Sequence, residues 1–233
     1  MTLHGPSIRA VAIGAVVVAI AVGMTSNVLF LAAFQFRIDW FLVPTRILGA
    51  GGQSAELLRW AAALDLIGYY LATGVLAYAL WWMLRPRNEV VADLSSLAAL
   101  GYVFAGGAGA AVLTIVAPML MHDHLAAAPA EQAVIATQFE VLFEAVWRSI
   151  WQVLDPILLA AWWLGIGLLV RADQPGLARL SMTLAAVAGI GAITSVLGPD
   201  LVRDVGLVLV FSLWAAWWIW LLVLFLRNDD PLP

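Results

Sequence analysis

The sequence predicts an all-α polytopic membrane protein with six transmembrane helices in one bundle. Of its 233 residues, 64% are hydrophobic and only 11% are charged. The apolar residues gather in runs that reach the roughly 20 residues needed to cross a hydrocarbon layer about 30 Å thick. The polar stretches between these runs are too short for a soluble domain. We therefore expect one membrane-embedded domain that covers residues 1–233.

Six apolar segments follow one another along the chain, and each is expected to form one span. They cover residues 8–36, 57–84, 94–121, 150–170, 177–197 and 202–226. Two intervening segments are long, and we predict outer loops at 37–56 and 122–149. Loops of this length in a compact protein are more often functional than idle. After Pro129, the second segment is expected to become a helix that runs into the fourth span.

The distribution of arginine predicts the orientation. Six arginines flank the ends of the chain and the two tight turns, between spans two and three and between spans four and five. They are Arg9, Arg85, Arg87, Arg171, Arg179 and Arg227. Because cytoplasmic segments carry an excess of basic residues, we expect both termini in the cytoplasm and the protein in an inner cell membrane.

Composition excludes several classes of function. Cysteine and lysine are absent, so disulfides, thiolate metal sites and a retinal Schiff base are excluded. No histidine lies in the middle of a span, which excludes a bis-histidine haem. A net charge of −4 offers no basic patch for nucleic acid. The expected partners are the lipid bilayer, other membrane subunits and further copies of the chain, and the cofactor stays unknown.

A stripe of polar residues leads into the fourth span. Its members share one face of a helix and are Glu140, Glu144, Arg148, Gln152 and Asp155. Charged groups are expensive in lipid and mark functional sites by default. Pro156 directly follows the stripe and predicts a kink. The alternative interpretation is a helical extension whose charges meet water, with Asp155 satisfied by a neighbouring helix.

Two more polar residues fall at the depth of Asp155. At about 1.5 Å per residue, Asn27, Asp65 and Asp155 all lie roughly 24–30 Å from the inner ends of their helices. The sequence therefore predicts an outward-facing polar pocket in which Asp155 could carry a proton. The candidate residues are Asn27, Asp65, Glu144, Arg148, Gln152 and Asp155.

Two weaker candidates accompany the pocket. His122 and His124 could bind a transition metal from an extended segment, whereas a polar helix exit is the simpler interpretation. Six tryptophans lie deep in the predicted spans and could line a quinone, isoprenoid or pigment groove, or pack against lipid. They are Trp162, Trp163, Trp214, Trp217, Trp218 and Trp220.

Part of the chain resembles an uncharacterised family of bacterial six-span membrane proteins, a domain of unknown function. The resemblance covers residues 48–110. It rests on four short motifs, at Gly49 to Gly52, Asp65, Arg85 to Asn88 and Leu97 to Tyr102. The chain departs from the family in span three, where an arginine and an acidic residue are replaced by small and aromatic residues. The resemblance implies a fold and a bacterial membrane location, but no activity.

Three hypotheses for function follow. The first is a protein that binds or transports an ion or small molecule through the polar pocket. The second is a non-catalytic subunit or assembly partner of a larger membrane complex. The third is a membrane enzyme that acts on a lipid or isoprenoid, with carboxylates as general acid and base.

Overall fold

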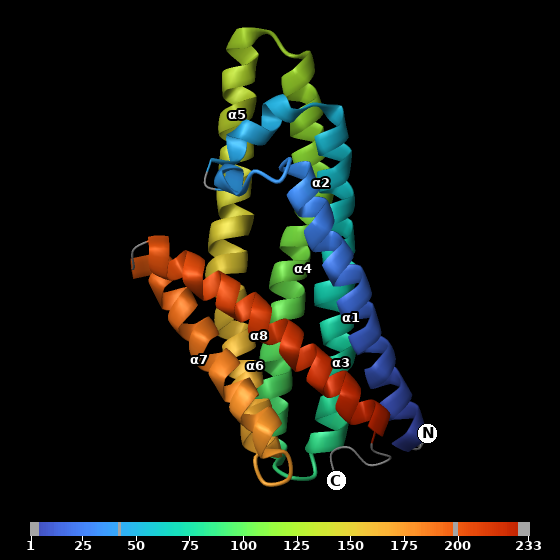
Figure 1. Ribbon diagram of the computed structural model, residues 1–233. Coiled ribbons are helices and arrows are strands. Elements are labelled where there is room, and N and C mark those ends of the chain that lie inside the picture. The colour runs from blue at the N-terminus through green and yellow to red at the C-terminus, as the bar shows by residue number, and fades with distance from the viewer. Residues whose placement is uncertain (1–4, 42, 198–199, 228–233) are drawn as a thin grey trace.

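The chain folds into an elongated bundle of helices (Figure 1). The computed structural model describes residues 5–41, 43–197 and 200–227, and 92% of the chain is helical, with no strand in the described part. The all-α prediction is thus confirmed. The helices are α1 (Gly5–Ala33), η1 (Ile38–Phe41), η2 (Pro44–Ala50), α2 (Gly52–Asp65), η3 (Leu66–Leu71), α3 (Ala72–Leu84), α4 (Glu89–Ala126), α5 (Pro129–Phe143), η4 (Glu144–Leu154), α6 (Asp155–Val170), α7 (Pro175–Leu197) and α8 (Asp200–Arg227).

Two of the long helices change their hydrogen-bond pattern part-way along. The helix Gly52–Leu84 consists of α2, the π-helical segment η3 and α3, and the helix Pro129–Val170 consists of α5, the π-helical segment η4 and α6. In a π-helix each N–H bonds five residues back, so the turn is wider than in an α-helix. Such segments are rare and frequently lie at functional sites.

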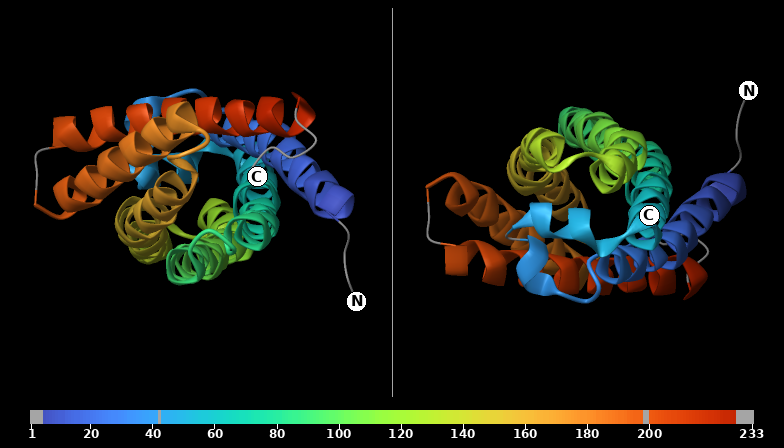
Figure 2. Two further views of the ribbon diagram at one scale, coloured as in Figure 1. Left: turned by 90° about the horizontal axis from the view of Figure 1, so that it is seen from below. Right: turned by 90° about the horizontal axis from the view of Figure 1, so that it is seen from above.

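The turns between the helices lie at the two opposite ends of the bundle. The start of α1, the end of α8 and the turns α3–α4 and α6–α7 lie at one end, and the α4–α5 turn lies at the opposite end (Figure 1). The three long helices α2–α3, α4 and α5–α6 pack side by side, and α1 packs along α2 and α3. The α7–α8 hairpin crosses the bundle obliquely, with α7 on α6 and α8 against α1 (Figure 2).

The described part of the chain has two separate hydrophobic clusters. The inner core joins α1, α3, α4, α6, α7 and α8 around the fully buried rings of Trp162, Trp163 and Trp217. The outer core joins the end of α1, η2, α2, the second half of α4 and α5 around Phe34, Phe139 and other apolar residues. Trp151 packs against both cores.

Five helices of the described chain are long and apolar enough to cross a membrane. They are Ile8–Ala33, Gly52–Leu84, Glu89–Ala126, Pro129–Val170 and Pro175–Leu197. All five coincide with expected spans. The sixth expected span coincides with α8, in which the described residues include the apolar stretch Ser212–Arg227. The helix content is thus compatible with a membrane protein, and the count of six spans stays a prediction.

The segment 122–149 agrees with the prediction in the helix that begins at Pro129 and runs into the fourth span, and differs from it in the length of the loop before that helix. It is helical apart from a short connection at Ala127 and Ala128, because α4 continues to Ala126 and α5 begins at Pro129. Hydropathy locates only the part of a helix that is apolar enough for lipid. Here His122, Asp123, His124 and Leu125 continue α4 to Ala126, since no proline or glycine interrupts the helix there, and Pro129 occupies a first-turn position of α5 where its missing N–H costs nothing.

The segment 37–56 is a compact connection with two short 3₁₀ helices, η1 and η2. The connection ends at Gly51, whose φ of 93° lies in the left-handed region that favours glycine, and residues 52–56 belong to α2. Ile47 and Leu48 of η2 are buried in the outer core. This connection therefore packs against the bundle instead of projecting from it.

Candidate functional site

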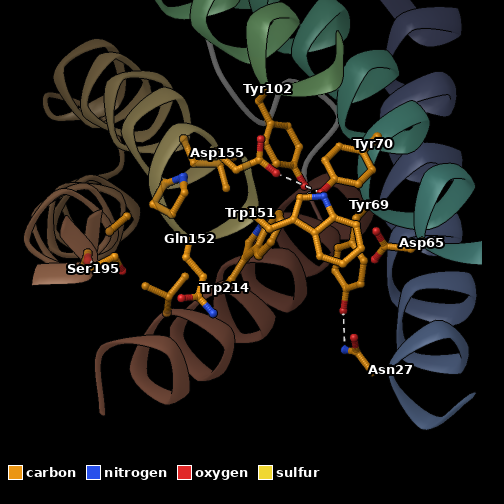
Figure 3. Close-up of a pocket in the computed structure, with 15 residues that line it drawn as sticks. Asn27, Asp65, Tyr69, Tyr70, Tyr102, Trp151, Gln152, Asp155, Ser195 and Trp214 are labelled. Atoms are coloured by element: carbon orange, nitrogen blue, oxygen red, sulfur yellow. Dashed lines mark hydrogen bonds between the residues drawn. The ribbon is translucent and has the colours of Figure 1, made fainter. Parts of the chain in front are cut away.

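A cavity of about 110 Å³ lies between the α-helical bundle and the α7–α8 hairpin. Residues from α1, α2, η3, α4, η4, α6, α7 and α8 line it (Figure 3). The lining residues are Asn27, Asp65, Tyr69, Tyr70, Tyr102, Trp151, Gln152, Asp155, Pro156, Leu159, Ala188, Gly191, Ser195, Val210 and Trp214. Four of the six predicted pocket residues, Asn27, Asp65, Gln152 and Asp155, are thus brought together.

Asp155 is held on one side of the cavity by a tyrosine. The hydroxyl of Tyr70 donates a hydrogen bond of 2.9 Å to Asp155 Oδ2 (Figure 3). Asp155 is 4% exposed, and its Oδ1 is buried without a hydrogen-bond partner among the described residues. Unpaired buried polar atoms are uncommon and point to strain or to a missing ligand.

Gly106 of α4 makes the contact between Tyr70 and Asp155 possible. A Cβ atom built on Gly106 would overlap both the Tyr70 ring and the Asp155 carboxyl group. The Gly106 carbonyl also accepts a hydrogen bond from Trp151 Nε1 at 3.3 Å. Gly106 therefore leaves room for the Tyr70–Asp155 contact and also binds Trp151 through its backbone.

Asp65 lines the same cavity from α2. It is 8% exposed, and its carboxyl group has no hydrogen bond or ion pair within the described part of the chain. Beside it, Tyr69 accepts a hydrogen bond of 2.7 Å from Asn27 Nδ2 (Figure 3). That bond uses a lone pair of the Tyr69 oxygen and leaves the phenol proton available to the cavity.

The two π-helical segments hold the two carboxyl groups at the cavity. Asp65 is the last residue of α2 before η3, and Asp155 is the first residue of α6 after η4. The N–H of Asp155 bonds to the Ile150 carbonyl, five residues back. Pro156 follows and has no N–H to donate. Both aspartates therefore lie where a helix passes between two hydrogen-bond patterns.

The cavity is acidic and aromatic. Among the described residues that line it, none is basic and five carry aromatic rings. The ring centroids of Tyr70 and Tyr102 are 4.7 Å apart, and those of Tyr69 and Trp214 are 5.2 Å apart. Buried carboxylates are expensive unless a positive group pairs with them or they take up a proton, so this site can hold a cation or protons.

Glu144 and Arg148 do not line the cavity, contrary to the sequence prediction. They form an ion pair with each other at 3.0 Å, and their side chains are 38% and 46% exposed. The reason is the π-helical pattern of η4, because the predicted stripe assumed α-helical spacing throughout. The wider turns of η4 change which residues share a face. Gln152 and Asp155 therefore face the cavity, whereas Glu144 and Arg148 do not.

The predicted metal pair is not brought together. His122 and His124 lie in the last turns of α4, where residues two apart point away from each other. His122 Nε2 instead lies 3.4 Å from Glu56 Oε1. No group of three or more potential metal-binding side chains was found within the described residues.

Sequence reasoning missed most of the aromatic wall. Tyr69 and Tyr70 come one turn after Asp65, and that proximity is a signal that could have found them. Of the deep tryptophans, Trp214 lines the cavity, and Trp162, Trp163, Trp217 and Trp218 are buried in the inner core instead of facing lipid. Only Trp220 is exposed, at 43%.

Comparison with known proteins gives no relative. No model of a protein family, no characterised protein and no solved structure matches the chain. The resemblance of residues 48–110 to an uncharacterised family therefore stays a prediction.

Proposed function

We propose that this protein binds a small cationic solute, in the membrane, at the cavity between Asp65 and Asp155. The observation that carries the proposal is that two buried carboxyl groups line one cavity in which no described lining residue is basic. A positive charge there pairs with carboxyl groups that otherwise lack a cationic partner. The unpartnered Oδ1 of Asp155 gives such a ligand a free acceptor.

The aromatic rings support an organic cation in particular. Cations bind over the faces of tyrosine and tryptophan, and aromatic cages select quaternary ammonium groups. Tyr69, Tyr102 and Trp214 form a connected wall of such rings. The Trp214 centroid lies 5.2 Å from that of Tyr69 and 6.2 Å from that of Tyr102. A protonated or quaternary amine uses both the rings and the carboxyl groups.

The helix geometry supports a role in transport. Secondary transporters build their sites in the bilayer where helices are interrupted. Both aspartates of this cavity adjoin a π-helical interruption. We therefore propose that the protein moves its cation across a membrane, with the α4–α5 end facing outward and both termini on the cytoplasmic side.

Calorimetric titration of the purified protein in detergent tests the binding proposal, with tetramethylammonium chloride as the probe. The parent protein is expected to bind it, and Asp65→Asn with Asp155→Asn is expected to lower the affinity at least about tenfold, because a buried charge partner is lost. Tert-butanol, a neutral molecule of similar shape, is expected not to bind.

Glu144→Gln is the matched control, since it removes an acidic residue of the predicted stripe that does not line the cavity. It is expected to bind as the parent does. Size-exclusion chromatography and thermal melts verify that each variant is folded. A parent that binds no probe, or a folded double variant with parental affinity, would contradict the proposal.

A further inference from the structure

A second hollow, of about 220 Å³, adjoins the acidic cavity between α1 and α8. This α1–α8 groove is lined by Ala19, Ile20, Met24, Tyr69, Trp214, Ala215, Trp218 and Ile219. From it we propose that the cation carries an alkyl chain, so that the ligand is an amphiphilic ammonium compound. Its head would occupy the acidic cavity and its chain the α1–α8 groove. This inference rests on the proposed function.

The first argument is that the two hollows are neighbours. Tyr69 and Trp214 line both, and their ring centroids lie 5.2 Å apart. These two rings are therefore the only side chains shared by the two lining sets of the described chain. A ligand that reaches past them has its charged group among the carboxyl groups and its remainder in the groove.

The chemistry of the groove is the second argument. Apart from Tyr69 and the two indoles, its lining consists of aliphatic, alanine and methionine side chains. It has no charged residue. An alkyl chain gains from such a surface, whereas a charged head group would lose its hydration there without a partner. The charged head of an amphiphile is therefore favoured in the acidic cavity, and its alkyl chain in the α1–α8 groove.

Exposure at the groove is the third argument. Met24 and Ile219 are 42% and 56% exposed on α1 and α8. α1 is one of the helices apolar enough to cross a membrane, so these side chains face lipid if it does. An amphiphile dissolved in the bilayer meets the groove directly, with its chain already at the right depth.

Packing toward the α4–α5 end is the fourth argument. Trp151, in the cavity wall, contacts Phe30 and Trp147 with ring centroids 6.0 Å and 5.7 Å away. Phe30 belongs to the outer core, which fills the bundle on that side. A ligand that arrives between α1 and α8 does not have to open this core.

Gly23 fixes the position of the shared tyrosine. A Cβ on Gly23 would lie 2.9 Å from Tyr69 Cζ, so the ring rests directly on the backbone of α1. Together with the bond from Asn27, this contact holds Tyr69 between the two hollows. The Tyr69 ring between the two hollows is therefore a positioned side chain, and a ligand that occupies both hollows passes the edge of this ring.

The test is a titration with alkyltrimethylammonium ions of increasing chain length, from methyl to butyl to hexyl, with Ala215→Phe and Ala216→Phe. Ala215 lines the groove, and Ala216 is its exposed neighbour that lines neither hollow. Because both variants add the same side chain, nonspecific partition into detergent is matched.

For the parent and Ala216→Phe, affinity is expected to rise by up to about fourfold for each added methylene, the factor that corresponds to about 0.8 kcal/mol. For Ala215→Phe, tetramethylammonium is expected to bind as in the parent, while the gain with chain length is lost. Equal chain-length gains in Ala215→Phe and Ala216→Phe, with tetramethylammonium still bound, would overturn the inference and leave the proposed function standing. Absence of binding by every compound would overturn both.

Discussion

At the scale of single residues, the site depends on a few close contacts that hydropathy does not reveal. Asp65, Gln152 and Asp155 could be identified from the sequence because polar residues are rare in apolar segments. Tyr70 could not, because a tyrosine in a span is ordinary and its bond to Asp155 joins residues 85 positions apart. Gly106 could not be identified either, because a glycine carries no polar group and its function depends on which side chains it faces.

Gly106→Ala is expected to destabilise the protein, because the added methyl group would overlap Tyr70 and Asp155. Overpacking of this kind costs about 1–3 kcal/mol. Gly14→Ala is the matched control, since a Cβ there meets nothing within 4 Å in α1, and it is expected to be neutral or slightly stabilising. Thermal melts in detergent compare the two, and a Gly106→Ala melt equal to that of Gly14→Ala would mean that the contact is looser than described.

At the scale of elements, the existence of the helices was predictable and their inner pattern was not. Apolar runs located five helices long enough to cross a membrane. The π-helical segments η3 and η4 left no signal in hydropathy, because a change from i−4 to i−5 bonding needs no particular residue type. That change separated Arg148 from Asp155, which α-helical spacing had placed on one face.

The start of α5 offers a second test at this scale. Ala128 has the extended backbone of an N-cap, and its N–H bonds to Glu131 Oε2 at 3.3 Å. Alanine has no side-chain oxygen to complete the reciprocal capping pair. Ala128→Ser supplies one, and we expect it to raise the free energy of unfolding by about 0.5–1 kcal/mol.

Ala127→Ser is the control for that change, since it adds the same hydroxyl one residue before the cap position. It is expected to leave the melting temperature unchanged in the same detergent. If the two serine variants melt together, the cap geometry at Ala128 is not as described.

At the scale of the whole molecule, the two ends of the bundle are distinguished by the turns that they carry. The α4–α5 end carries exposed Gln53 and Asp123, and the opposite end carries the turn at Ala172. Both predicted tight turns lie at the end where α1 begins and α8 ends (Figure 1). Two long helices separate these turns along the chain, so both turns lie at the same end of the bundle. The side of the membrane on which that end lies is predicted from the arginine distribution alone.

Single-cysteine labelling tests the proposed orientation, and the absence of native cysteine removes background. In intact cells, Gln53→Cys and Asp123→Cys are expected to react with a membrane-impermeant thiol reagent. Ala172→Cys is expected to react only after the cells are lysed. Labelling of Ala172→Cys alone before lysis would invert the proposed orientation.

The separation of the hydrophobic interior into two cores has a consequence for how the protein opens. Each core is a set of mutual contacts that can hold or separate as a cooperative unit. Trp151 packs against both and lines the acidic cavity, but the other core residues that line it, such as Tyr70, Tyr102 and Trp214, belong to the inner core. Loss of packing in the outer core alone would therefore leave the two aspartates in place, so the α4–α5 end can open locally without dismantling the site.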